Sequence, residues 1–173
     1  VIFSTDNVDF SIRPQYGFSW LLWTSPTASY MLMDFELKRA YMFRDFVAFK
    51  NHDDARLDCA DSAPQWELPT LTSRHESLIL NAYHDAAFAP AFHILLQRRL
   101  APFLDFVWDN GEPSPYIFWY PFRPFFNLYR CAELREDLYW WDIKCSDYVH
   151  RRVVCEGPEW DYSGAFNWLV EAA

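Results

Sequence analysis

Glycine is scarce in this chain, at 4 of 173 residues. Phosphate-binding loops, dinucleotide-binding fingerprints and the Gly-x-Ser-x-Gly elbow of hydrolases all need glycines at fixed spacings. None of these motifs is present. The sequence therefore gives no sign of these enzyme classes, and it predicts no catalytic residue, no cofactor and no metal site.

Positive charge is also scarce, with 15 lysines and arginines against 24 acidic residues and a net charge of −9. Non-specific nucleic-acid binding needs a basic stripe, so we expect no nucleic-acid partner. The first residues, 1–6, lack the basic start and apolar run of a secretory signal.

A long apolar run is missing too. The longest uncharged stretch, Pro14–Met33, contains two prolines and a glycine and is a poor membrane-spanning helix. Within it, Trp20 and Trp23 flank two leucines. They suit either the headgroup region of a membrane or a groove on another protein, and both readings stay open.

Aromatic residues, by contrast, make up 20% of the chain and gather in Pro115–Phe126. Its three prolines exclude a regular helix and a central strand, so we expect an extended aromatic strap. Exposed rings need cover, and they predict a surface that binds a partner. The candidate partner-binding residues are Trp20, Trp23, Tyr116, Phe118, Trp119, Tyr120, Phe122 and Trp140.

The spacing of apolar residues in steps of three and four predicts a mainly α fold of three to four helices with long irregular aromatic and proline-rich arms. Ser25-Pro26 is a helix start, and Ser73 with Glu76 forms a capping box. The expected unit is one helical domain, 1–173, with arms 1–24 and 159–173. The expected helices cover 26–50, 74–89 and 127–156, and Pro90 either kinks the second of them or opens a further helix over 90–100. An acidic loop is expected at 51–72, with Trp66 and Leu68 as anchors.

The phase of the last expected helix separates two neighbouring tryptophans. At about 100° per residue, Trp141 falls on the apolar stripe and Trp140 points away from it. This phase is the reason why Trp140 is expected to bind a partner.

The four cysteines, Cys59, Cys131, Cys145 and Cys155, contain no Cys-x2-Cys pair, which argues against a zinc site. Reduced, buried cysteines are the preferred interpretation, and disulfides are the alternative. If they are oxidised, Cys145 and Cys155 should bridge to other cysteines, because ten residues of helix separate their Cα atoms by about 15 Å.

Two short patterns point to mitochondria. The spacing of Cys145 and Cys155 resembles half of the twin Cys-x9-Cys pattern of small disulfide-stapled proteins of the mitochondrial intermembrane space. Leu128-Tyr129-Arg130 is similar to the tripeptide of a family of small mitochondrial assembly proteins. These resemblances imply a location at the mitochondrial inner membrane or in the intermembrane space.

The histidines offer one weak chemical signal. Asp147 and His150 would share a face of the last helix, as in the carboxylate–histidine pairs of di-iron bundles, but a bundle site needs two such pairs and only one is present.

Together these patterns predict a non-enzymatic accessory or scaffold subunit of a larger, membrane-associated and mitochondrial complex. Its partners would be other protein subunits, with contact to a membrane interface or lipid left open. The alternative is a helical enzyme or carrier with an aromatic pocket for an apolar ligand, using His84, His93 or His150.

Overall fold

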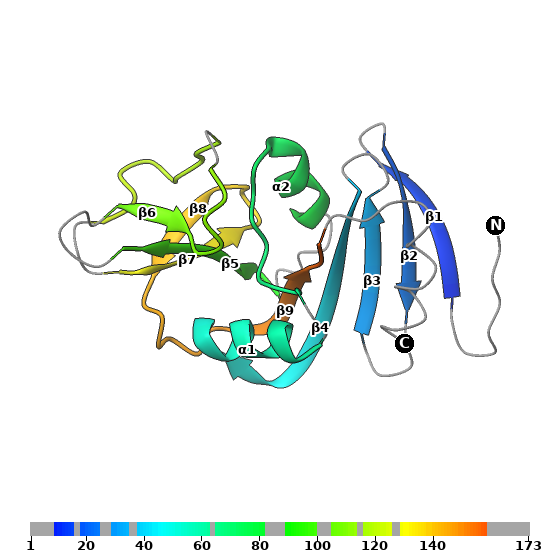
Figure 1. The fold of residues 1–173 in the computed structure, drawn as a ribbon, viewed down its shortest axis with the longest axis horizontal. Helices are drawn as coiled ribbons and strands as arrows, with labels where there is room; N and C mark the ends of the chain where they lie inside the picture. The colour runs from blue at the N-terminus through cyan, green and yellow to red at the C-terminus, as the bar shows by residue number, and fades with distance from the viewer. Residues whose placement is uncertain are drawn as a thin grey trace.

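In the computed structural model the described part of the chain is mainly β, with two helices, arranged as Figure 1 shows. The structure describes residues 9–15, 18–24, 29–34, 38–62, 65–81, 89–99, 105–113, 116–125 and 129–158, with the backbone alone for 9–33. The expectation of a mainly α fold is wrong.

Two antiparallel sheets form the frame. The first has the strand order β1-β2-β3-β4-β9 and the second the order β6-β5-β7-β8. The elements are β1 (Asp9–Gln15), β2 (Phe18–Thr24), β3 (Ser29–Asp34), β4 (Arg39–Lys50), α1 (His52–Ser62), α2 (Arg74–Asn81), β5 (Ala91–Arg98), β6 (Phe106–Trp108), β7 (Cys131–Arg135), β8 (Trp140–Ile143) and β9 (His150–Glu156).

The sheets meet where β5 lies near β9, at the centre of the molecule (Figure 1). Helix α1 lies against β9 on one side of this junction, and α2 lies on the other side (Figure 1). Last in the sequence, β9 is therefore central in space and connects the two halves.

The helix expected at 26–50 is replaced by β3 and β4, which pair from Ser29↔Arg44 to Asp34↔Arg39. In β4, four consecutive residues from Ala40 to Phe43 are buried. A strand covered on both faces shows no alternation, so its apolar residues can match a helical spacing by coincidence.

The helix expected at 127–156 is replaced by β7, β8 and β9. In β8, Trp140 and Asp142 are buried while Trp141 and Ile143 are half-buried, which is the period of a strand. Trp140 is 1% exposed, so the expectation that it points outward to a partner is wrong.

Helix α1 lies inside the segment expected to be a loop. Its buried residues are His52, Ala55 and Cys59. This stripe is narrow and contains no large apolar side chain, so the sequence pattern does not predict an amphipathic helix here. The oxygen Oδ1 of Asn51 caps it, accepting from the Asp54 N–H at 2.8 Å.

Helix α2 was expected, and its capping box is present. Glu76 accepts from the Ser73 N–H at 3.1 Å, and Ser73 Oγ accepts from the Glu76 N–H at 3.4 Å. The anchors Trp66 and Leu68 are buried as predicted, at 7% and 0% exposed. The helix expected at 90–100 is strand β5 instead.

The structure describes only part of the two expected arms, 1–24 and 159–173. Part of the N-terminal arm forms β1 and β2, and β2 contains Trp20 and Trp23, whose side chains lie outside the described part of the chain. The C-terminal arm, 159–173, lies outside it as well. Among the described residues, no helix is long and apolar enough to cross a membrane.

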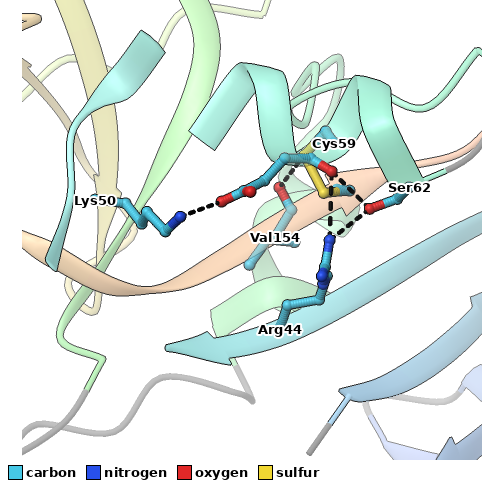
Figure 2. The surroundings of a disulfide bond; sticks show 7 residues. Arg44, Lys50, Cys59, Ser62 and Val154 are labelled. Carbon is cyan, nitrogen blue, oxygen red and sulfur yellow. Dashed lines mark hydrogen bonds and ion pairs between the residues drawn. A yellow bond between two sulfur atoms is a disulfide. The ribbon is translucent and has the colours of Figure 1, made fainter. Parts of the chain in front are cut away.

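All four cysteines are joined in disulfides, Cys59–Cys155 and Cys131–Cys145, instead of being reduced. The first fastens α1 to β9 (Figure 2). Around it, Arg44 Nη1 donates to Ser62 Oγ at 2.8 Å, and Lys50 Nζ lies 3.0 Å from the Asp58 carboxylate, so β4 is tied to the same helix (Figure 2).

We predict that removal of Cys59–Cys155 costs more stability than removal of Cys131–Cys145. Their sequence separations are 96 and 14 residues, and loop-closure entropy gives about 4–5 and about 3 kcal/mol respectively. Denaturant unfolding of the two double Cys→Ala variants measures this difference. Peptide mapping that finds other pairs, or equal losses in the two variants, contradicts it.

Three histidines meet in the core between the sheets. The ring of His93 on β5 lies with its centroid 5.5 Å from that of His52 on α1 and 4.5 Å from that of His150 at the start of β9. Their exposures are 2%, 0% and 4% respectively. His150 Nε2 lies 2.6 Å from the buried Glu133 carboxylate, so its partner is Glu133, in place of the expected helical pairing with Asp147.

The neighbours of this cluster favour neutral rings at His52 and His93. Gln97 donates to His52 Nδ1 at 3.2 Å, which leaves Nε2–H to donate to the Ile94 carbonyl at 3.0 Å. Burial lowers the pKa of His52, and burial together with the charge of His150 lowers that of His93 well below its usual value. Burial is the largest single effect on Glu133 and opposes its ionisation, but the hydrogen bonds and charges of His150 and Arg135 together outweigh it and lower the pKa of that carboxyl.

We predict that the protein loses stability as the pH falls below about 6.5. His52 and His93 stay neutral in the fold while they gain protons in the unfolded chain, so each contributes a loss of up to about 1.4 kcal/mol per pH unit in that range. Denaturant unfolding between pH 7.5 and 5 measures the slope. His93→Gln should reduce the slope of the unfolding free energy against pH, whatever the variant's stability at pH 7.5. An unchanged slope contradicts the role assigned to His93.

Candidate functional site

The candidate site is the loop between β6 and β7, whose described part includes 109–113 and 116–125. These described residues form no helix or strand, as the prolines predicted, but backbone hydrogen bonds anchor them. The Tyr120 N–H donates to the Trp140 carbonyl at 3.0 Å, and the Trp140 N–H donates to the Phe118 carbonyl at 2.8 Å. The loop therefore extends the second sheet along the edge strand β8.

The inner side of this loop packs on the indole of Trp140. The rings of Trp108, Tyr116 and Trp119 meet it edge to face, with centroids 5.4, 5.6 and 5.8 Å away. Of the candidate partner-binding residues, Tyr116, Phe118 and Trp119 are thus partly buried against the core. Their first role is to fix the loop.

The outer side carries exposed apolar side chains: Ile117 (66% exposed), Tyr120 (38%), Phe122 (94%) and Phe125 (43%). The Tyr120 ring stacks on Trp141, with centroids 4.1 Å apart and planes 26° apart. We call Tyr120, Phe122, Phe125 and Trp141 the outer aromatic surface. Two of its members, Phe125 and Trp141, were not among the candidates from sequence.

Phe122 sits at a strained position. The Arg123 N–H donates to the Tyr120 carbonyl at 2.9 Å, which closes a four-residue turn with Pro121 and Phe122 in the middle. Phe122 has φ 67°, the conformation that type II turns normally give to glycine. A bulky residue held in this conformation, with its ring almost fully exposed, indicates a functional constraint.

A single carboxylate holds the outer side in place. Asp142 is 2% exposed, and each of its oxygens has a partner from the loop. Arg123 Nη1 lies 2.9 Å from Oδ1, and the Phe125 N–H donates to Oδ2 at 2.7 Å. The Arg123 guanidinium also lies over the rings of Phe125 and Trp141, at 4.1 and 4.7 Å from their centroids.

Behind the loop lies a group of carboxylates around one arginine. Arg39 contacts Glu156, and lies 3.5 Å from Glu76 and 3.6 Å from Glu112. Burial raises the pKa of Glu156 to about 8 in spite of the attraction of Arg39. Even with Glu156 protonated, two carboxylates face one guanidinium, so this region is negatively charged.

No protein family matches the sequence as a whole, and no curated protein shows significant sequence similarity to it. Solved structures do share the arrangement of its strands and helices. The cow C-type carbohydrate-recognition domain of CD23, solved in the presence of a GlcNAc2Man3 oligosaccharide, is 24% identical with a TM-score of 0.60, over 77% of this chain and 95% of that one. The chain has the C-type lectin fold.

Two further solved structures share this fold. The C-type lectin domain of murine dendritic cell inhibitory receptor 2, in complex with an N-glycan, is 17% identical with a TM-score of 0.55, over 67% of this chain and 89% of that one. A calcium-independent type II antifreeze protein is 20% identical with a TM-score of 0.54, over 69% and 85%.

This likeness overturns the expected function. The accessory subunit of a mitochondrial membrane complex, and its helical alternative, both depended on a helical fold that the chain does not have. Of the histidines proposed for the alternative, His93 and His150 lie in the buried core cluster, and His84 lies outside the described residues.

A calcium ion, which the C-type name implies, does not fit the described part of the loop. Among the described residues there is no group of three or more histidine, cysteine, aspartate or glutamate side chains that could hold a metal ion. Asp142 already has Arg123 and the Phe125 N–H on its two oxygens. In this chain the guanidinium supplies the positive charge that holds the loop to β8.

We predict that Arg123→Ala opens the outer side of the loop. It removes one of the partners of a buried carboxylate, which costs about 1–3 kcal/mol. Hydrogen exchange of the 116–125 amides should rise several-fold, with little change in β1–β4. Adding Asp142→Asn should restore part of the stability, because no buried charge is then left with a missing partner.

The matched control is Arg99→Ala, which removes an ion pair with Asp105 on the solvent-exposed surface and should leave loop exchange unchanged. Unchanged loop exchange in Arg123→Ala itself contradicts the role assigned to this arginine.

Proposed function

We propose that this domain recognises carbohydrate through the outer aromatic surface without a bound cation. The observation that carries the proposal is the exposed Phe122 at a position where glycine is preferred, next to the stacked rings of Tyr120 and Trp141. The fold supports it, because structures with this fold include domains solved with an oligosaccharide and with an N-glycan.

The chemistry of the surface suits a sugar. One face of a pyranose ring presents C–H groups that pack on aromatic rings, while its hydroxyls need polar partners. Exposed tyrosine and tryptophan combine an apolar face with a polar tip. Arg123 and Arg135 lie over the rings of this surface, at 4.7 and 4.0 Å from the Trp141 centroid, and place hydrogen-bond donors beside it.

A protein ligand is the second candidate, and two side chains favour it. Phe122 and Ile117 are 94% and 66% exposed and offer no hydrogen bond to a hydroxyl group. Aromatic residues with arginine nearby are also enriched where proteins meet. The same loop variants test both a carbohydrate and a protein ligand. Which of the two binds the protein decides between them.

We predict that mannose- and N-acetylglucosamine-containing oligosaccharides bind the protein equally with and without EDTA. Phe122→Gly should keep or raise the melting temperature, since glycine accepts φ > 0 without strain, yet weaken binding at least about tenfold, or 1.4 kcal/mol. NMR titration and thermal melts measure the two effects.

Leu57→Ala is the matched control, because Leu57 is an exposed apolar residue (62%) on α1. It should leave binding unchanged. Binding that EDTA abolishes would contradict the cation-free mode. Failure of every oligosaccharide on a glycan array, together with capture of a protein that Phe122→Gly releases, would favour the second candidate.

A further inference from the structure

A second candidate site lies on the inner side of the loop, in a pocket of about 200 Å³. Its aromatic and acidic lining consists of Phe106, Trp108, Tyr116, Trp119, Trp140 and Glu112, and four aliphatic or proline side chains complete it. At this size it admits a small group, since pockets for drug-sized ligands start at about 300 Å³.

Three rings of this pocket pack on the fourth. The planes of Trp108, Tyr116 and Trp119 make angles of 77°, 75° and 81° with that of Trp140. The pocket is lined by this cluster together with Phe106. The face of an aromatic ring carries negative electrostatic potential, so a pocket lined by rings attracts a cation.

The charges around the pocket have the sign that a cation needs. Glu112 is its one charged lining residue, and no lysine or arginine is among the described residues that line it. Glu112 shares Arg39 with the buried Glu76 and Glu156, which leaves this side negative. Three arginines also act on the lining: Arg39 lies 3.6 Å from Glu112, the charge of Arg74 acts on Tyr116, and the Arg98 guanidinium lies 4.8 Å from the centroid of Phe106. Phe106, with a guanidinium already on its ring, is the least available to a bound cation.

The same lining selects among cations. A primary ammonium carries three N–H donors, and each of them needs an acceptor when it leaves water. The pocket offers it one carboxylate and a set of apolar walls. A quaternary ammonium has no N–H to satisfy, and its methyl groups pack on rings while its charge is stabilised by their faces.

We propose that this pocket is an aromatic cage for a quaternary ammonium group, such as the trimethylammonium of choline. The cage is independent of the carbohydrate-binding proposal, because it uses Trp108, Trp119 and Glu112, whereas that proposal uses Tyr120, Phe122 and Trp141. The two rest on opposite sides of one loop.

The experiment titrates the full chain with choline and, in parallel, with its uncharged isostere 3,3-dimethyl-1-butanol, following tryptophan fluorescence and the indole N–H signals in NMR spectra. Choline should bind saturably and at least about tenfold more tightly than the isostere, because the cation–π attraction acts on the charge alone. Ethanolamine, which has a primary ammonium, should bind more weakly than choline.

Three variants locate the binding. Trp119→Leu should abolish choline binding, and Glu112→Gln should weaken it about threefold to tenfold, since it removes the one charge in the lining. Phe122→Gly should leave it unchanged, which separates this site from the outer aromatic surface. Glu112→Gln changes one atom near the surface and keeps the test valid if Trp119→Leu fails to fold.

The proposal is overturned if the isostere binds as tightly as choline, which would make the pocket a generic apolar site. It is also overturned if the indole signals do not respond to choline, or if Glu112→Gln binds choline as the parent does. Loss of choline binding in Phe122→Gly would place the ligand on the outer surface instead and would equally reject the cage.

Discussion

Strand β8 holds the loop between β6 and β7 in place, because two of its four residues are buried and both bind the loop. Trp140 exchanges two backbone hydrogen bonds with the loop and provides the ring on which its inner side packs. Asp142 accepts from Arg123 and from the Phe125 N–H. The disulfide Cys131–Cys145 brackets this strand and its partner β7, so the support itself is fastened covalently.

The consequence is a loop shaped by the protein's own groups instead of by a metal ion. A buried carboxylate requires a compensating charge, and here a guanidinium provides it while also lying over two rings. Arginine is suited to this position because its planar group can donate to a carboxylate and stack on aromatic faces at the same time. The outer rings are thus held in place by the same guanidinium that pairs with Asp142.

The aromatic residues of the loop fall into an inner, packed group and an outer, exposed group. Rings on the inner side are buried against Trp140 and keep the backbone in place, whereas Phe122 is exposed at a strained position. Stability alone favours glycine in that turn. Because the ring is exposed, Phe122→Gly removes it without opening a cavity in the core.

The core at the junction of the two sheets contains polar and titratable side chains. Three buried histidines and Glu133 occupy the junction of the two sheets, where β9 lies against β5. Polar groups in such a place remain stable only with partners, which here come from Ile94, Gln97 and Glu133. The junction that unites the sheets therefore contains histidines whose pKa burial lowers.

The sequence by itself determined those features that depend on neighbours along the chain. The capping box of Ser73 and Glu76 starts α2, the prolines keep 116–125 out of regular structure, and Trp66 and Leu68 are buried. Each follows from the stereochemistry of a few adjacent residues, which is the same in any fold.

Only the tertiary structure decided between helix and strand, and it alone paired the cysteines and joined Arg123 to Asp142. Strands β5 and β7 are covered on both faces, so their apolar residues carry no period of two, and periodicity is informative only where one face is exposed to water. Cys59 and Cys155 are 96 residues apart. Contacts between segments so distant are set by how the whole chain packs, and no local pattern of residues encodes them.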